Sequence, residues 1–268
     1  MKLSSRFTQP GAVLASIIVA LAILAALFPQ LFTNGNPLHG NDEGLLPPSM
    51  FHWFGTDSVG RDLYTRMVFG TRQTLLGALV AVLVGLVLGS LIGLLAGARG
   101  GWLDAVLMRI VDVLLSIPAL LLSLSIIILL GYGTINAAIA VGITSVATFA
   151  RLTRSQVISV SRLDFVEASY GSGATTAQVL FRHILPNSLT PVLALAAVQF
   201  GSAILQLSVL GFLGYGAPPP IPEWGLIIAD SRDYIATSWW LTVLPGIVII
   251  AVVMSANHLS SIIQKELR

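Results

Sequence analysis

Side chains that could do chemistry are sparse in this chain and form no catalytic or metal-binding pattern. The sequence has no cysteine, which excludes disulfides and thiolate metal sites. The glycine-rich run at 171–176 lacks the lysine that would reach a bound phosphate, and no strand precedes it. None of the four histidines has the spacing of a metal-binding motif: they are His39, His52, His183 and His258. We therefore expect no catalytic residue, no metal and no cofactor on this chain.

The composition indicates a membrane protein. Apolar residues make up 55% of the 268 residues and charged residues only 10%, whereas soluble domains average about a quarter charged. The net charge of +2 and the scattered arginines provide no basic stripe for nucleic acid. The apolar run from Ala12 to Phe28 is long for a secretory signal and no small-residue cleavage site follows it, so we expect a retained first span.

Apolar windows long enough to cross about 30 Å of hydrocarbon occur about six times. The sequence therefore predicts an all-α, polytopic protein with about six transmembrane helices. The predicted spans are 11–32, 73–98, 111–131, 135–150, 189–213 and 239–260. We divide the chain into 1–72, an N-terminal span with its external loop, and 73–268, a core of five spans.

Basic residues set the orientation. If the N-terminus is cytoplasmic, ten Lys and Arg residues lie inside and four outside, the bias that the positive-inside rule expects. The inside residues are Lys2, Arg6, Arg99, Arg109, Arg151, Arg154, Arg162, Arg182, Lys265 and Arg268; the outside ones are Arg61, Arg66, Arg72 and Arg232. The acidic residues that fall outside agree with this: Asp42, Glu43, Asp57, Asp62, Glu223, Asp230 and Asp233. Both termini and the loop at 151–188 are therefore predicted to be cytoplasmic.

The second span has a small residue at every fourth position. This spacing aligns the small residues along one ridge of a helix, where another helix can approach closely. We expect tight packing at this ridge; sliding along it during gating is the alternative. The residues are Gly77, Ala81, Gly85, Gly89, Gly93 and Gly97.

Other spans contain residues that interrupt an apolar helix. Pro118 removes a backbone donor and should kink span three. Asp112 is expected to pair with Arg109, one turn earlier. One face of span five is polar and would be costly against lipid, so we expect it to line a translocation path, with hydrogen bonding between helices as the alternative. That face carries Gln199, Ser202 and Gln206.

The polar segment from Asp164 to Asn187 lies between two strongly apolar windows. A short helix that docks in a cleft of another protein needs small residues, apolar anchors and a charged rim. The small residues are Ala168, Ser169, Gly171, Gly173 and Ala174, and the possible anchors are Phe165, Val166 and Tyr170. Glycine favours the left-handed conformation at a helix end, so Gly173 should end one helix. The caps expected for the helices that follow are Thr175 or Thr176, and Asn187 or Ser188.

Two external segments have turn chemistry. Gly55-Thr56-Asp57 and Gly60-Arg61-Asp62 predict a folded turn, in which Arg61 pairs with Asp57 or Asp62. We expect it to pack on the outer surface as a lid; docking of an external receptor is the alternative. The Pro-rich segment at 217–225 should be stiff, with Trp224 at the membrane interface.

The cytoplasmic segment resembles the "EAA" loop of permeases from ATP-driven importers of dipeptides, oligopeptides and nickel, which reads approximately V-E-A-A-x-x-x-G-A and then R-H-I-L-P-N. Matches run through Val166-Glu167-Ala168, Gly173-Ala174 and Arg182 to Asn187, and Ser169 replaces the second alanine. The run from His52 to Arg66 is similar to the H-x-x-G-T-D-x-x-G-R-D-x-x-S-R element of the second, C-type permease. Matches at 102–118 and 212–225 follow in order.

The resemblance implies a type I importer permease in the bacterial plasma membrane. Such a subunit is not an enzyme. It forms half of a pore with a second permease, receives solute from an external binding protein, and is driven by two cytoplasmic ATPases that hold ATP and Mg²⁺. The implied ATPase-coupling residues are Phe165, Glu167, Ala168, Ser169, Tyr170, Gly173, His183 and Pro186. The external-loop residues are Gly55, Asp57, Gly60, Arg61 and Asp62. Small peptides are the expected cargo, with nickel or metal–opine complexes as an alternative. A passive channel or membrane scaffold is the alternative from another class.

Overall fold

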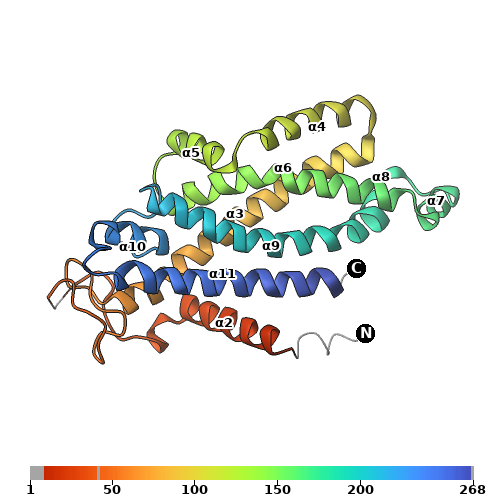
Figure 1. The fold of residues 1–268 in the computed structure, drawn as a ribbon. Helices are drawn as coiled ribbons and strands as arrows, with labels where there is room; N and C mark the ends of the chain where they lie inside the picture. The colour runs from red at the N-terminus through yellow and green to blue at the C-terminus, as the bar shows by residue number, and fades with distance from the viewer. Residues whose placement is uncertain (1–8, 41–42, 267–268) are drawn as a thin grey trace.

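The chain, described here by a computed structural model over residues 9–40 and 43–266, is helical, and the described part contains no β-strand (Figure 1). The long helices are α2 (Pro10–Leu27), α3 (Leu63–Arg99), α4 (Gly101–Ser116), α5 (Ala119–Leu130), α6 (Thr134–Ser161), α9 (Leu185–Phe212) and α11 (Trp240–Glu266). The short ones are α7 (Asp164–Gly171), α8 (Thr176–Val179) and α10 (Trp224–Ser231), with 3-10 turns at Pro29–Leu31 and Arg232–Tyr234. Lys2, Arg6, Asp42, Arg268 and the side chain of Lys265, all used in the charge pattern, lie outside the described part.

The prediction of about six spans is confirmed. In the described part of the chain, five helices are long and apolar enough to cross a membrane, and α4 with α5 makes a sixth candidate that is bent by 98°. The bend is sharper than the predicted kink. Pro118 lies between the two helices, and Ile117 before it is extended, with φ −91° and ψ 131°. A proline disfavours helical geometry in the residue before it, so it breaks this span in two.

Helix α3 begins well before the predicted window at 73. Asp62 caps it, because the Asp62 Oδ2 atom accepts a hydrogen bond from the Thr65 amide at 2.7 Å. Its 37 residues extend about 55 Å, which exceeds the thickness of the hydrocarbon core. The first turns of α3 therefore extend out of the membrane. The division of the chain at 72–73 falls within this helix and stays a prediction.

The expected cap at Asn187 or Ser188 is wrong. The chain stays helical from Thr176 through a π-helical stretch, Leu180–Ile184, to the end of α9. Continuous helical bonding leaves no free amides there for a cap to satisfy. Asn187 instead donates its side-chain amide to the His183 carbonyl at 2.6 Å.

The glycine ridge of α3 packs directly against α6, as predicted. A Cβ atom added at Gly89 would lie 2.5 Å from the Cβ of Phe149 and 2.6 Å from the carbonyl oxygen of Val146. On α6, Gly142 is equally close to α3, with Val84 Cβ only 2.7 Å from where its own Cβ would stand. The two backbones therefore meet without side chains between them.

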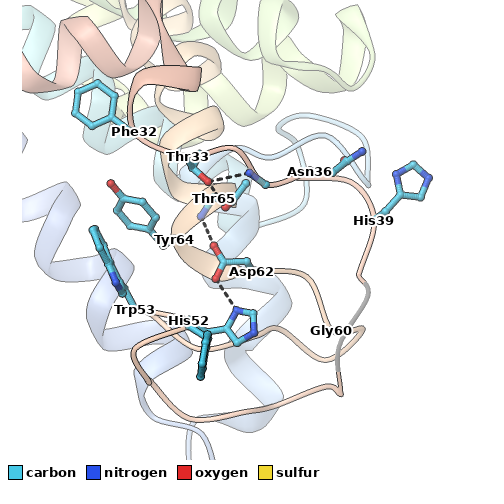
Figure 2. Close-up of a pocket in the computed structure, with 12 residues that line it drawn as sticks. Phe32, Thr33, Asn36, His39, His52, Trp53, Gly60, Asp62, Tyr64 and Thr65 are labelled. Atoms are coloured by element: carbon cyan, nitrogen blue, oxygen red, sulfur yellow. Dashed lines mark hydrogen bonds and ion pairs between the residues drawn. The ribbon is translucent and has the colours of Figure 1, made fainter.

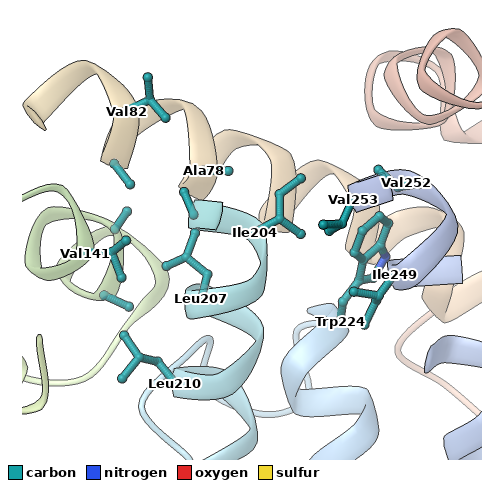
Figure 3. Close-up of a cluster of buried hydrophobic side chains, with 14 of the residues drawn as sticks. Ala78, Val82, Val141, Ile204, Leu207, Leu210, Trp224, Ile249, Val252 and Val253 are labelled. Carbon is teal, nitrogen blue, oxygen red and sulfur yellow. The ribbon is translucent and has the colours of Figure 1, made fainter. Parts of the chain in front are cut away.

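The main core lies where α3, α6, α9, α10 and α11 meet (Figure 3). Trp224 is only 1% exposed, and its indole nitrogen donates to the Met67 carbonyl at 3.1 Å. The expected position of Trp224 at the membrane interface is therefore wrong. The segment after Pro222 folds back as α10 and carries the ring into the core, where its polar atom finds a partner.

The two ends of the bundle differ. Helices α7 and α8 lie at the same end as the last turns of α11 and the start of α2, whereas residues 29–40, residues 43–62 and α10 lie at the opposite end (Figure 1). This arrangement agrees with the orientation predicted from charge.

Candidate coupling surface and external cap

Helix α7 is held in place by a small core of its own. Val166 and Val179 are completely buried and pack with Val157, Val160 and Ile184. The interpretation of Val166 as an anchor for another protein is therefore wrong, because the chain itself uses this side chain. The core fixes α7 against the far ends of α3 and α6.

The turn between α7 and α8 is well defined. Gly173 has a φ of +86°, and its amide bonds to the Tyr170 carbonyl while the Ala174 amide bonds to the Ser169 carbonyl. This is the Schellman pattern that ends a helix at a glycine, as predicted. Thr175 then caps α8 in a capping box with Gln178, which also confirms the predicted cap.

The outer side of α7 and α8 carries exposed aromatic and small residues. Phe165 is 43% and Tyr170 44% exposed, and Phe181, which the sequence analysis missed, is more exposed still. A Cβ added at Gly171 or Gly173 would meet no described atom within 4 Å. We name these five residues, with the exposed Glu167, Ala168 and Pro186, the coupling surface.

The remaining two predicted coupling residues are partly covered. Ser169 is half-buried and donates its hydroxyl to the Phe165 carbonyl at 2.8 Å. His183 is half-buried, with its ring centre 6.2 Å from that of Phe165 in an edge-on arrangement. Both residues contact Phe165 of the coupling surface.

Two ion pairs tie α4 to α6. Arg154 forms a bidentate pair with Asp104, at 2.5 and 2.6 Å. Arg151 pairs with Asp112 at 2.5 Å. The expected partner of Asp112, Arg109, is therefore wrong, because the acidic face of α4 is turned toward α6.

The external turn folds around Asp57, as predicted. Its Oδ1 atom accepts the amides of Val59 and Arg61 at 3.0 and 2.9 Å, and its Oδ2 atom accepts the Arg61 Nε at 2.6 Å. Gly55 and Gly60 have φ values of +78° and +77°, which glycine adopts without strain. We name residues 33–40 and 43–62 the external cap.

Asp62 links the external cap to α3. Besides capping that helix, it lies 3.0 Å from His52 Nδ1 (Figure 2). Beside this pair, Trp53 and Tyr64 pack with ring centres 4.9 Å apart and line a hollow of ≈ 350 Å³. The external cap thus combines a polar contact, between Asp62 and His52, with an aromatic contact, between Trp53 and Tyr64.

Arg66 joins three external segments, a role that the sequence analysis missed. It is 1% exposed and lies 3.5 Å from Asp57 and 3.7 Å from Asp230 of α10. Its Nη1 atom also donates to the carbonyls of Pro37 and Pro220. The sequence feature that could have indicated this role is the position of Arg66 at the end of the H-x-x-G-T-D-x-x-G-R-D-x-x-S-R element.

Two carboxyl groups near α10 have raised pKa values. Burial raises the pKa of Glu223, which is partly offset by the hydrogen bond that its Oε2 atom accepts from the Ala217 amide at 2.9 Å. Burial also raises the pKa of Asp230, against the opposing attraction of Arg66. Both groups make contacts at the external end of the bundle, Glu223 with the Ala217 amide and Asp230 with Arg66.

The polar face of α9 is half-buried at Gln199, Ser202 and Gln206. The Gln206 Oε1 atom is buried without a hydrogen-bond partner among the described residues. A role of this face in a translocation path stays a prediction.

Residues 89–268 match the family described as the binding-protein-dependent transport system inner membrane component. The chain belongs to this family and is a multi-pass subunit of a bacterial inner-membrane transport system. It is similar to the dipeptide transport system permease protein DppC of Alkalihalophilus pseudofirmus, with 41% identity over 92% of this chain and 81% of the relative. The probable D,D-dipeptide transport system permease protein DdpC of Escherichia coli is 40% identical over 93% of this chain and 84% of the relative. The fold also matches the MetNI methionine ABC transporter in an inward-facing conformation, with a TM-score of 0.64 and 20% identity, over 77% of this chain and 98% of the other.

Proposed function

We propose that this chain is the non-catalytic permease subunit of an ATP-driven importer of short peptides. The family and the dipeptide relatives support this function over a passive channel or a scaffold. The same relatives favour peptides over nickel or metal–opine complexes. No cofactor is proposed on this chain, and ATP and Mg²⁺ belong to two ATPase partners.

One observation carries the proposed coupling to the ATPases. Helix α7 is locked to its own chain through Val166, yet its other side presents Phe165 and Tyr170 with small residues between them. Exposed aromatic anchors beside small residues are what a short helix needs to seat in a cleft of another protein. Because α7 is fixed to the ends of α3 and α6, a displacement at this surface passes into the membrane helices.

The other partners follow from the same function. A second permease completes the pore, and the external binding protein delivers peptide at the end that carries the external cap. Gln199, Ser202 and Gln206 line the path, where water or peptide supplies the hydrogen bond that the Gln206 Oε1 atom lacks among the described residues.

Co-purification from the native membrane tests this function. The tagged chain should retain a second permease and two ATPases in mild detergent. Phe165→Asp should lose the ATPases but keep the second permease, because it places a charge at an apolar contact. Trp102→Asp, at another exposed aromatic residue, is the matched control and should retain both. A chain that purifies alone, or a Phe165→Asp variant that keeps its ATPases, contradicts the proposal.

A further inference from the structure

An apolar hollow of ≈ 320 Å³ is lined by residues of α2 and α3 and by Phe200 of α9. From α2 it is lined by Ile23, Ala26 and Leu27. Ile23 and Leu27 are exposed, so this part of the hollow is open to the surroundings of the bundle. Apolar side chains of this kind are the ones that a lipid acyl chain contacts in a membrane protein.

One cationic side chain lies among these apolar residues. Arg72 lines the hollow and is exposed. Within the described part of the chain, its guanidinium has no hydrogen bond and no ion pair. The neighbouring external arginines do have partners: both Arg61 and Arg66 lie against Asp57. Arg72 is therefore an arginine at an apolar surface whose donors find no partner among residues 9–40 and 43–266.

The position of Arg72 corresponds to the outer edge of the hydrocarbon. The 18 residues of α2 extend about 27 Å, close to the thickness of that layer, and Leu27 is its last residue. Arg72 and Leu27 line the same hollow, so Arg72 lies at the external end of the span. Leu79 is two turns further along α3, about 10 Å deeper. The hollow thus runs from a cation at the interface into the apolar layer.

We infer that this hollow binds a phospholipid of the outer leaflet, with the lipid phosphate on Arg72 and one acyl chain against Leu75 and Leu79. A phosphate matches the planar fork of a guanidinium and forms paired, charge-assisted hydrogen bonds with it. A cation at the interface with an apolar channel beneath it is complementary to a lipid in charge and in polarity. An apolar helix of another protein would match the lining of the hollow but would leave the guanidinium without a partner.

A bound lipid would bridge α2 and the rest of the bundle. The hollow separates the two helices on this side, and an acyl chain that fills it gives the lining side chains van der Waals partners in place of a void. The lipid would therefore stabilise the attachment of the first span. This role is separate from coupling to the ATPases and from the choice of cargo. The lipid site can therefore be tested independently of the proposed function.

Native mass spectrometry of the purified importer with added palmitoyl-oleoyl phosphatidylglycerol tests the inference. Arg72→Gln should weaken retention of one lipid about tenfold or more, the effect expected for a lost charge-assisted bond. Leu79→Trp fills the hollow and should also weaken it. Arg99→Gln is the matched control, because Arg99 is an exposed arginine at the opposite end of the same helix, and it should bind as the unmodified protein does.

Four results would overturn the inference. Equal retention by Arg72→Gln and Arg99→Gln would show that Arg72 holds no lipid. Equal binding of dioleoylglycerol, which lacks the phosphate, or full competition by inorganic phosphate, would exclude a phospholipid site. Because the chain has no cysteine, Leu76→Cys supplies a unique thiol; its cross-linking to the second permease in native membranes would assign the hollow to a protein contact.

Discussion

Replacing Gly89 by alanine should weaken the joint between α3 and α6. The added Cβ would meet three α6 atoms, two of them in the backbone: Phe149 Cβ at 2.5 Å, Val146 O at 2.6 Å and the Ala150 amide nitrogen at 3.0 Å. Backbone atoms cannot rotate aside as a side chain does, so the helices must separate. Overpacking of this kind typically costs about 1–3 kcal/mol.

The size of the effect is best measured against Gly246→Ala on α11. An alanine there has open space around its Cβ. Both substitutions gain the same helix propensity, roughly 1 kcal/mol, so the difference between them isolates the clash. Thermal unfolding of the purified protein in detergent should give Gly89→Ala the lower midpoint, by about 2–4 °C for each kcal/mol.

A Gly89→Ala variant as stable as Gly246→Ala would refute the reasoning. It would mean that the two backbones do not approach as closely as the ridge requires. Measuring uptake by the same variant tests whether the ridge also moves during transport. If the ridge also slides during gating, Gly89→Ala should reduce transport even at temperatures where the protein remains folded.

Three further predictions follow from the contacts above. Each single charge reversal, R154D or D104R, should lower the stability of the protein, and the double variant should restore it. A double-mutant cycle measured by thermal unfolding tests this. If the double variant recovers no stability, the ion pair does not stabilise the fold. Gly171→Trp should abolish uptake in membrane vesicles without unfolding the protein, whereas Gly173→Ala should mainly cost about 1–2 kcal/mol of stability, because alanine is strained at its positive φ; full uptake by Gly171→Trp would remove α7 from coupling. Because the pKa of Glu223 is raised in the folded state, folding retains a proton that the unfolded chain loses, so stability should fall as pH rises from its ordinary value of 4.5 through the raised one. Glu223→Gln should reduce this fall, and an unchanged pH profile would contradict the burial argument.

Features that depend on local sequence could be predicted. The four-residue spacing of small residues predicted the contact at Gly89. Gly173, with threonines two and three residues later, predicted the turn at Gly173 and the cap at Thr175. Asp57 with Arg61 was predicted because turn chemistry acts within a few residues.

Features that depend on distant partners could not. The partners of Asp112 and Trp224 lie on other helices, and nothing near them in the sequence specifies Arg151 or Met67. The burial of Val166 depends on where α3 and α6 end. The burial of Arg66 likewise requires Asp230, which is far away in the sequence and comes close only when α10 folds back.

Uptake by proteoliposomes tests the central claim most directly. The chain, its second permease and its two ATPases would be reconstituted with the external binding protein and a radiolabelled dipeptide. We predict accumulation against a gradient that requires ATP on the side of the coupling surface and the binding protein on the side of the external cap. Equilibration of the dipeptide without ATP would contradict an importer and indicate a passive channel. Uptake of a nickel complex in place of the dipeptide would contradict the peptide assignment.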